Sequence, residues 1–160
     1  MVVDFAIRKF SGCKVASVTY VGAYRGTDMM RDEFYKIIAW AREKGIRTGR
    51  WFFLEHDSPG MHGNKRKWEA CVEIKDRARS GGGIRIRELP PQLVASIRFD
   101  PDKISPRVIY CGLSGWIEWR KKEKEYKEAG EAREVYTGDP WKSTRAWANT
   151  EIQVPVKKIS

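Results

Sequence analysis

The feature that most constrains this chain is an internal repeat, in which similar residues recur about 79 positions later. The tetrapeptide Val15-Ala16-Ser17-Val18 returns as Val94-Ala95-Ser96-Ile97. Further pairs match at this shift: Arg8 with Arg87, Tyr20 with Phe99, Ile38 with Ile117, Trp40 with Trp119, and Trp68 with Trp147. Because the matches extend from position 8 to position 68, they indicate two copies of one folding unit rather than a short solenoid repeat.

The first copy reads as two strands, a helix and two more strands. Alternating apolar residues predict a strand around Ile7 and a returning partner strand over residues 15–21, joined by a turn at residues 11–12. A helix follows over residues 28–44, with apolar side chains at spacings of three and four. Gly45 marks its end, behind a lysine in the last turn.

The second copy repeats these elements after a turn at residues 90–91. Its helix carries Leu113 and Ile117 on one stripe and is expected to continue as a charged stem to Gly130. The closing strands are expected at residues 51–55 and 68–74 in the first copy and at residues 133–137 and 146–154 in the second. We therefore predict an α+β fold: two β-β-α-β-β halves with pseudo-twofold symmetry, a curved and mainly antiparallel sheet, and two helices on its outer face.

The length of 160 residues predicts a single domain over residues 1–160. The halves are expected at about residues 3–78 and 84–158, with a glycine-rich linker at residues 79–83. No stretch is apolar enough to span a membrane, and the N-terminus lacks the apolar core of a signal peptide. We therefore expect a cytoplasmic protein without a membrane partner.

Cysteine and charge usage limit the partners further. The three cysteines are odd in number and widely spaced, which argues against disulfides and zinc, and Cys71 and Cys111 lie in apolar runs that predict burial. The net charge is +10, but basic groups such as Arg120-Lys121-Lys122 are followed by glutamates. This favours a solvated surface over a nucleic-acid partner. Binding of a protein or nucleic acid through the basic surface stays an alternative, and it predicts a steep loss of binding with salt.

Several short motifs occur in a defined order along the two copies. They are Val15-Ala16, Gly22-Ala23-Tyr24, residues 40–45, residues 68–74, Glu134-Val135-Tyr136, Asp139-Pro140 and residues 150–156. With these motifs, from about residue 5 to residue 157, the chain resembles the GyrI-like effector-binding domain family. That family includes the ligand-sensing domains of AraC- and MerR-type multidrug regulators and free-standing relatives. The run Asp100-Pro101-Asp102-Lys103 departs from it, because a second Gly-x-Tyr turn is expected there.

The resemblance implies a central cleft that takes flat or lipophilic, often cationic, small molecules against an acidic floor. By motif position the acidic residue is Glu134. Known members divide among drug sensing, antagonism of gyrase inhibitors and hydrolysis of strained electrophilic toxins. Through distant haem-binding relatives, the resemblance also raises haem as a possible cofactor. No histidine in this sequence, however, lies on a clear helix face to bind iron.

Strand alternation places Glu134 and Tyr136 on one face and Val135 on the other. If Val135 packs under the helix, the other two side chains point to the concave side, where a cation gains Coulomb attraction and contact with aromatic rings. The expected ligand-binding residues are Glu134, Tyr136, Tyr20, Tyr24, Phe53, Trp116 and Trp141. The alternative is that Glu134 pairs with Arg133 or Lys142 at the surface. Trp40 and Trp119 are expected in the core or at its edge.

The expected function is binding without catalysis, by a free-standing sensor or sequestering protein that is a monomer or a weak dimer. An enzymatic alternative is a hydrolase in which Glu134 acts as general base and Tyr136 as acid. No cofactor is expected. His56, Asp57 and His62 match no standard metal-site spacing, so no metal is expected either.

Overall fold

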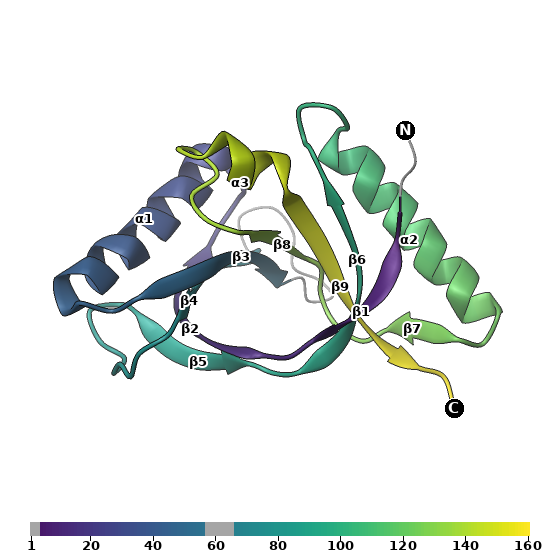
Figure 1. Ribbon diagram of the computed structural model, residues 1–160, viewed down its shortest axis with the longest axis horizontal. Coiled ribbons are helices and arrows are strands. Elements are labelled where there is room, and N and C mark those ends of the chain that lie inside the picture. The colour runs from purple at the N-terminus through teal and green to yellow at the C-terminus, as the bar shows by residue number, and fades with distance from the viewer. Residues whose placement is uncertain (1–3, 57–65) are drawn as a thin grey trace. The chain divides into compact units, whose positions relative to one another are not determined.

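The computed structural model describes residues 4–56 and 66–160 (Figure 1). The chain divides into two compact units. We call Gly12–Pro90 the continuous unit, and Met1–Ser11 together with Pro91–Ser160 the split unit, because two separate chain segments form it.

The continuous unit is an antiparallel sheet with a helix packed against it. Its elements are β2 (Cys13–Val21), α1 (Thr27–Lys44), β3 (Thr48–His56), β4 (Lys67–Ile74) and β5 (Arg85–Leu89). The strands lie in the order β3-β4-β2-β5. The buried stripe of α1 includes Phe34 and Ile37, and the Phe34 ring stacks on Trp51 at 4.8 Å. Gly45 ends the helix in the left-handed conformation at φ 67°.

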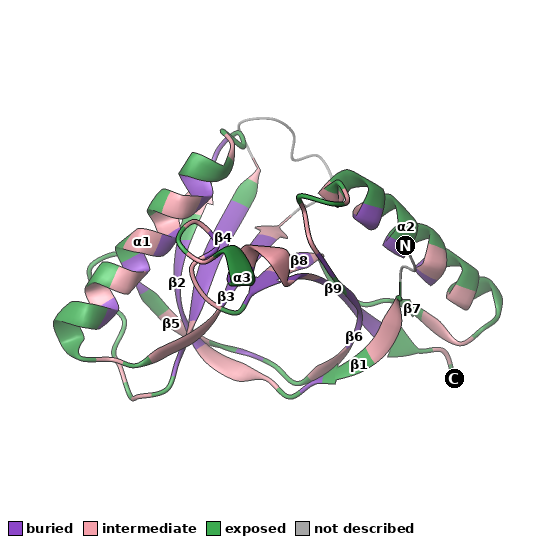
Figure 2. Cartoon of the chain, turned by 45° about the horizontal axis from the view of Figure 1, so that its top comes forward, coloured by how far each residue is buried: buried purple, intermediate pink, exposed green. Residues whose placement is uncertain are grey.

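The split unit has the same plan with additions. Its elements are β1 (Ala6–Phe10), β6 (Gln92–Phe99), α2 (Pro106–Lys122), β7 (Tyr126–Glu128), β8 (Arg133–Tyr136), α3 (Thr144–Ala148) and β9 (Thr150–Lys158). The strands lie in the order β1-β6-β9-β8, and β7 also pairs with β9. In Figure 2 the buried residues of α2 form one stripe. The stripe consists of Ile109, Leu113 and Ile117, which pack with Ala95, Ile97, Ile152 and Val154 of β6 and β9.

The α+β class and the duplication are confirmed, and the strand registers define which positions are equivalent. Val15 pairs with Glu73 as Val94 pairs with Pro155, so β2 and β6 match at the expected shift of 79. The closing strands β4 and β9 match at 82 instead, because 155 − 73 = 82. The expected match of Trp68 with Trp147 is therefore wrong, and Trp147 lies in α3.

The expected hairpin between the first two strands is also wrong. β1 pairs with β6, and β2 pairs with β5, so each copy takes its outermost strand from the other copy's hairpin. The units consequently divide at residues 11–12 and 90–91 rather than at residues 79–83. The latter segment lies within the continuous unit, where Gly81 and Ile84 exchange backbone hydrogen bonds of 2.9 and 3.0 Å.

Two element boundaries differ from expectation for local reasons. The charged stem does not form, because α2 ends at Lys122, Lys124 adopts φ 58°, and the following residues pair with β9 as β7. The start of the last predicted strand is α3 instead, since the Ser143 hydroxyl accepts a hydrogen bond from the Ala146 N–H and caps this helix.

Burial agrees with the sequence for one cysteine and not for the other. Cys71 is buried as predicted, whereas Cys111 lies on the exposed side of α2. Trp119 is 51% exposed and therefore outside the core, and Trp40 is half-buried. Within residues 4–56 and 66–160, the helices are too short or too polar to cross a lipid bilayer.

Candidate functional site

A carboxylate lies at the edge of the apolar core of the split unit. Glu134 on β8 pairs with Ile152 on β9, and Ile152 belongs to the cluster that packs against α2. Because directly paired residues point to the same side of a sheet, Glu134 faces the side that α2 covers. Two phenol groups hold it: the Tyr136 hydroxyl donates to Oε2 at 2.6 Å, and the Tyr110 hydroxyl of α2 donates to Oε1 at 3.1 Å.

The surroundings of Glu134 disfavour its charge. Burial raises the pKa of Glu134 above its ordinary value, and the hydrogen bonds from Tyr136 and Tyr110 oppose this shift without cancelling it. Among the described residues, no lysine, arginine or histidine forms an ion pair with this carboxylate. The site can therefore hold a proton, or accept a cation that supplies the missing charge.

The sequence predicted correctly that Glu134 and Tyr136 share one face of the strand, but it expected Val135, rather than these two residues, to face the helix. Val135 pairs with Glu151 on the side away from α2, so it does not pack under the helix. The surface alternative with Arg133 is also wrong, since Arg133 donates to Gln153 Oε1 at 2.8 Å and lies over the Phe10 ring at 4.4 Å.

Sequence reasoning missed Tyr110. It follows Ile109, the first residue of the apolar stripe of α2, and its ring packs at the edge of the core. A hydroxyl-bearing residue beside such a stripe was the available signal, because a half-buried phenol needs a hydrogen-bond partner. The spacing along the sequence revealed only Tyr136, which lies on the same strand as Glu134.

Three other predicted ligand-binding residues lie in the continuous unit. Phe53 stacks on Trp68 with ring centroids 5.7 Å apart, and Tyr24 lies 5.2 Å from the same indole. The Trp68 Nε1–H donates to the Gly22 carbonyl at 2.9 Å. The Tyr20 ring carries the guanidinium of Arg25 at 5.1 Å. These contacts give the rings a packing role within this unit.

The last two predicted residues lie in the split unit but in different contacts. Trp116 of α2 is 6.0 Å from Phe5 and is covered by the Arg120 guanidinium at 4.7 Å. Trp141 lies in a turn in which its backbone N–H donates to Asp139 Oδ1 at 2.9 Å. Tyr110 and Tyr136, rather than these two tryptophans, donate hydrogen bonds to Glu134.

The duplication shows that Glu134 is a substitution within a common plan. Phe53 pairs with Ala70 of β4, and Glu134 pairs with Ile152 of β9, where 152 − 70 = 82, the shift between these strands. The position that carries a buried phenyl ring in one unit therefore carries a carboxylate in the other. Packing does not require an acid at this point of the fold.

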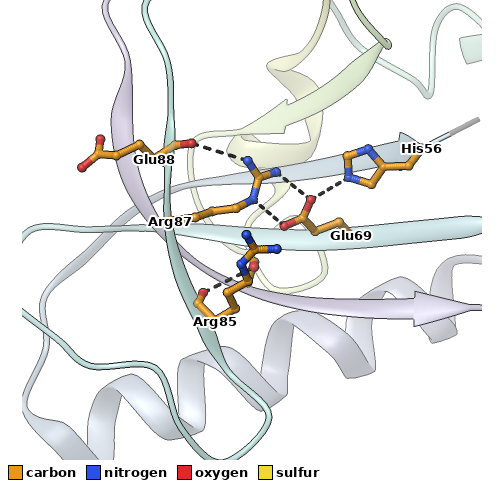
Figure 3. A network of polar contacts seen from close by, with 6 residues as sticks. His56, Glu69, Arg85, Arg87 and Glu88 are labelled. Atoms are coloured by element: carbon orange, nitrogen blue, oxygen red, sulfur yellow. Dashed lines mark hydrogen bonds and ion pairs between the residues drawn. The ribbon is translucent and has the colours of Figure 1, made fainter.

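A second polar cluster lies in the continuous unit (Figure 3). The Glu69 carboxylate of β4 accepts hydrogen bonds from Arg87 Nε at 2.8 Å and Nη2 at 2.6 Å, and it lies 2.6 Å from His56 Nε2. Burial alone would raise the pKa of Glu69, but the hydrogen bonds from His56 and Arg87 outweigh it and hold the pKa well below its ordinary value. This carboxylate, unlike Glu134, is fully compensated by its own chain.

His56 therefore has a different partner from those considered in the sequence, and Asp57 and His62 lie outside the described residues. Across the described ranges, no group of three or more His, Cys, Asp or Glu side chains could hold a metal ion.

Comparison with known proteins gives the family context. The family model of the GyrI-like small molecule binding domain matches residues 4–157. A search of curated proteins gave no match. The solved EcmrR C-terminal domain is similar at a TM-score of 0.73 and 22% identity, covering 99% of this chain and 100% of that one. EcmrR in a DNA complex matches at 0.76 and 22% identity over 98% of this chain, which spans 58% of that longer protein.

Two more distant structures share the fold. SAV2435 bound to tetraphenylphosphonium has a TM-score of 0.55 and 10% identity, with 96% of this chain and 94% of that one covered. A hydrolase from Listeria innocua has a TM-score of 0.58 and 10% identity, with 96% and 91% covered. At these identities the likeness establishes the fold alone.

Proposed function

The chain belongs to the GyrI-like small molecule binding domain family, and on that premise we propose that it binds a lipophilic organic cation at Glu134. The observation that carries this proposal is the carboxylate itself. It lies at the edge of an apolar core, holds two phenol hydrogen bonds, and has no cationic partner within the described part of the chain. A bound cation would offset the desolvation that now disfavours the charged carboxylate.

The chemistry around Glu134 suits a large, weakly hydrated cation better than a small one. The two residues that hold Glu134, Tyr110 and Tyr136, are aromatic, and aromatic rings attract cations through their electron-rich faces. A small ion such as ammonium binds water more strongly, so removing its water shell at an apolar site would cost more free energy. A structural neighbour bound to tetraphenylphosphonium supports this choice of ligand class.

Calorimetric titration with tetraphenylphosphonium tests the proposal. Glu134→Gln should weaken binding ten- to a hundredfold, about 1.5–3 kcal/mol, as for other contacts to a charged group. Glu128→Gln, an exposed change on β7 of the same unit, is the matched control and should bind as the wild type does. Wild-type affinity should rise with pH, because ionisation of Glu134 creates the attracting charge. Equal affinity of the wild type and Glu134→Gln would refute the site.

A second candidate function is hydrolysis, with Glu134 as the general base. The raised pKa of Glu134 and the Tyr136 hydroxyl at 2.6 Å favour it, since a general base works best with a pKa near the working pH. A structural neighbour is a hydrolase. Turnover of a strained epoxide by the wild type, lost in both Glu134→Gln and Tyr136→Phe, would establish catalysis. Binding of tetraphenylphosphonium without any turnover would leave the binding function alone.

We also propose that residues 4–157 act as one binding domain, in the cytoplasm, as a monomer or weak dimer. Light scattering after size exclusion over a range of concentrations tests the oligomeric state. A stable dimer at micromolar concentration would contradict this part of the proposal.

A further inference from the structure

A cavity of about 310 Å³ lies in the split unit on the side away from α2. Among the described residues it is lined by Arg8 of β1, Ser96 and Arg98 of β6, and Glu151 of β9. Strand alternation separates these side chains from Glu134: Glu151 and Ile152 are neighbours on β9 and point to opposite sides, and Glu134 pairs with Ile152. The cavity is therefore distinct from the cation site proposed above.

One polar group in this cavity lacks a partner in the described part of the chain. Ser96 is 1% exposed, and its Oγ makes no hydrogen bond to any described residue. A buried hydroxyl in this state is unfavourable, and native proteins rarely contain one. The equivalent residue of the continuous unit is Ser17, whose Oγ donates to the Arg85 carbonyl at 3.3 Å. The same position is thus satisfied in one copy and unsatisfied in the other.

The charges differ between the copies in the same way. Arg8 and Glu151 are the equivalents of Arg87 and Glu69, by the shifts of 79 and 82. Where Arg87 binds Glu69 through two hydrogen bonds, Arg8 forms no ion pair within the described part of the chain.

Glu151 has found other partners in the split unit. Its Oε2 accepts from Gln153 Nε2 at 2.7 Å, and its Oε1 lies 3.6 Å from Arg98 Nε. The described residues that line the cavity therefore contribute two guanidinium groups and one carboxylate, a net charge of +1. The excess positive charge belongs to Arg8, because Arg98 is the guanidinium that neutralises Glu151.

We propose that this cavity binds the oxyanion group of a small molecule, a carboxylate or a phosphate, between Arg8 and Ser96. The guanidinium of Arg8 supplies a planar pair of donors, the geometry that suits both anions, and the Ser96 hydroxyl supplies a third donor. In the continuous unit the Glu69 carboxylate binds Arg87. The equivalent carboxylate in the split unit, that of Glu151, binds Gln153 instead, so the anionic group of the ligand would take its place next to Arg8. The volume lies at the lower end of small-molecule pockets.

Titration calorimetry with inorganic phosphate and, separately, acetate tests the proposal, in chloride buffers of constant ionic strength. At least one anion should give saturable binding to the wild type, and their relative affinities show which oxyanion the site prefers. Arg8→Gln should weaken this binding at least tenfold. Lys9→Gln is the matched control, because Lys9 is exposed, follows Arg8 on β1 and points to the opposite side. It should leave the affinity unchanged.

Ser96→Ala provides a second variant that does not depend on removing a charge. It should weaken anion binding several-fold while leaving the unfolding midpoint unchanged or higher, since the hydroxyl makes no hydrogen bond to lose. Glu134→Gln should keep full anion binding, which separates this site from the cation site. The proposal is overturned if neither anion binds, or if Arg8→Gln and Lys9→Gln weaken binding equally, which would indicate general attraction to a basic surface.

Discussion

Removing the charge of Arg87 should destabilise the protein far more than removing the charge of Arg85, which lies two residues away on the same strand. Arg87 makes two hydrogen bonds to Glu69, whose side chain is only 5% exposed (Figure 3). Arg87→Met keeps most of the side-chain length and leaves this carboxylate with the His56 ring nitrogen, 2.6 Å away, as a remaining hydrogen-bond partner. Arg85→Met is the control, because the Arg85 side chain is exposed and the hydrogen bond from the Ser17 hydroxyl goes to the Arg85 backbone carbonyl, which the substitution keeps.

The magnitude follows from the burial of the pair. Breaking a buried ion pair by removing one partner costs about 3–5 kcal/mol. We expect about 3 kcal/mol for Arg87→Met, the lower end of this range, because the Arg87 side chain is 23% exposed and His56 remains. At ~2–4 °C per kcal/mol for a chain of this size, the midpoint of thermal unfolding should fall by ~6–12 °C. Arg85→Met should stay within about 0.5 kcal/mol of the wild type.

Urea unfolding followed by tryptophan fluorescence measures these changes, with the slope of the transition held constant between variants. The double variant Arg87→Met, Glu69→Met should recover most of the loss, because an apolar pair of similar volume replaces the ion pair at little cost. The reasoning fails if Arg87→Met and Arg85→Met lose equal stability. It also fails if the double variant is less stable than Arg87→Met alone.

Four further outcomes follow from the structure. Folding lowers the pKa of Glu69, so its ionised carboxylate should stabilise the folded state fully above about pH 4.3 and lose this effect as the pH falls toward the pKa in the folded state. The unfolding free energy of Glu69→Gln should therefore fall less steeply with acid than that of the wild type. The pKa of Glu134 is raised, so its ionisation opposes folding as pH rises from about 4.3, and thermal unfolding should show Glu134→Gln to be more stable at pH 7, with the difference vanishing in acid. An aromatic disulfide reagent should label Cys111 rapidly in the native protein and Cys71 only in denaturant, as peptide mapping would reveal. Gly45→Ala should lower the unfolding free energy in urea by about 1 kcal/mol, because it places a β-carbon at φ 67°.

The sequence predicted the parts of the fold that local patterns determine. The apolar stripe of α1 and its stop at Gly45 require only residues that are neighbours on one helix. The β2–β6 equivalence likewise follows from a repeated tetrapeptide. The class of fold and the presence of two copies followed from such local patterns together with the other matches between the two copies.

The sequence could not predict which strands pair with each other, and the reason is physical. β1 and β5 are equivalent by the repeat, with Arg8 and Arg87 at matching positions, so either strand can satisfy the edge of either unit. Alternation identifies the strands but does not choose between equal partners. The side of the sheet that Glu134 faces was also predicted wrongly, because the apolar Val135 next to it was expected to pack under the helix. Two tyrosine hydroxyls allow the carboxylate to face α2 instead, and one of them comes from α2 itself.

The exchange of β1 and β5 has a consequence for the order in which the chain matures. Phe10 pairs with Gln92, 82 positions later, whereas the pairings of β2 with β4 and β5, and of β3 with β4, all lie within Gly12–Pro90. During synthesis the continuous unit can therefore close while β1 still waits for β6 to leave the ribosome, with its backbone donors and acceptors unpaired. Joining residue 11 directly to residue 91 would preserve the pairing of Phe10 with Gln92 across a two-residue turn. Deleting residues 12–90 would therefore remove the continuous unit without interrupting a strand.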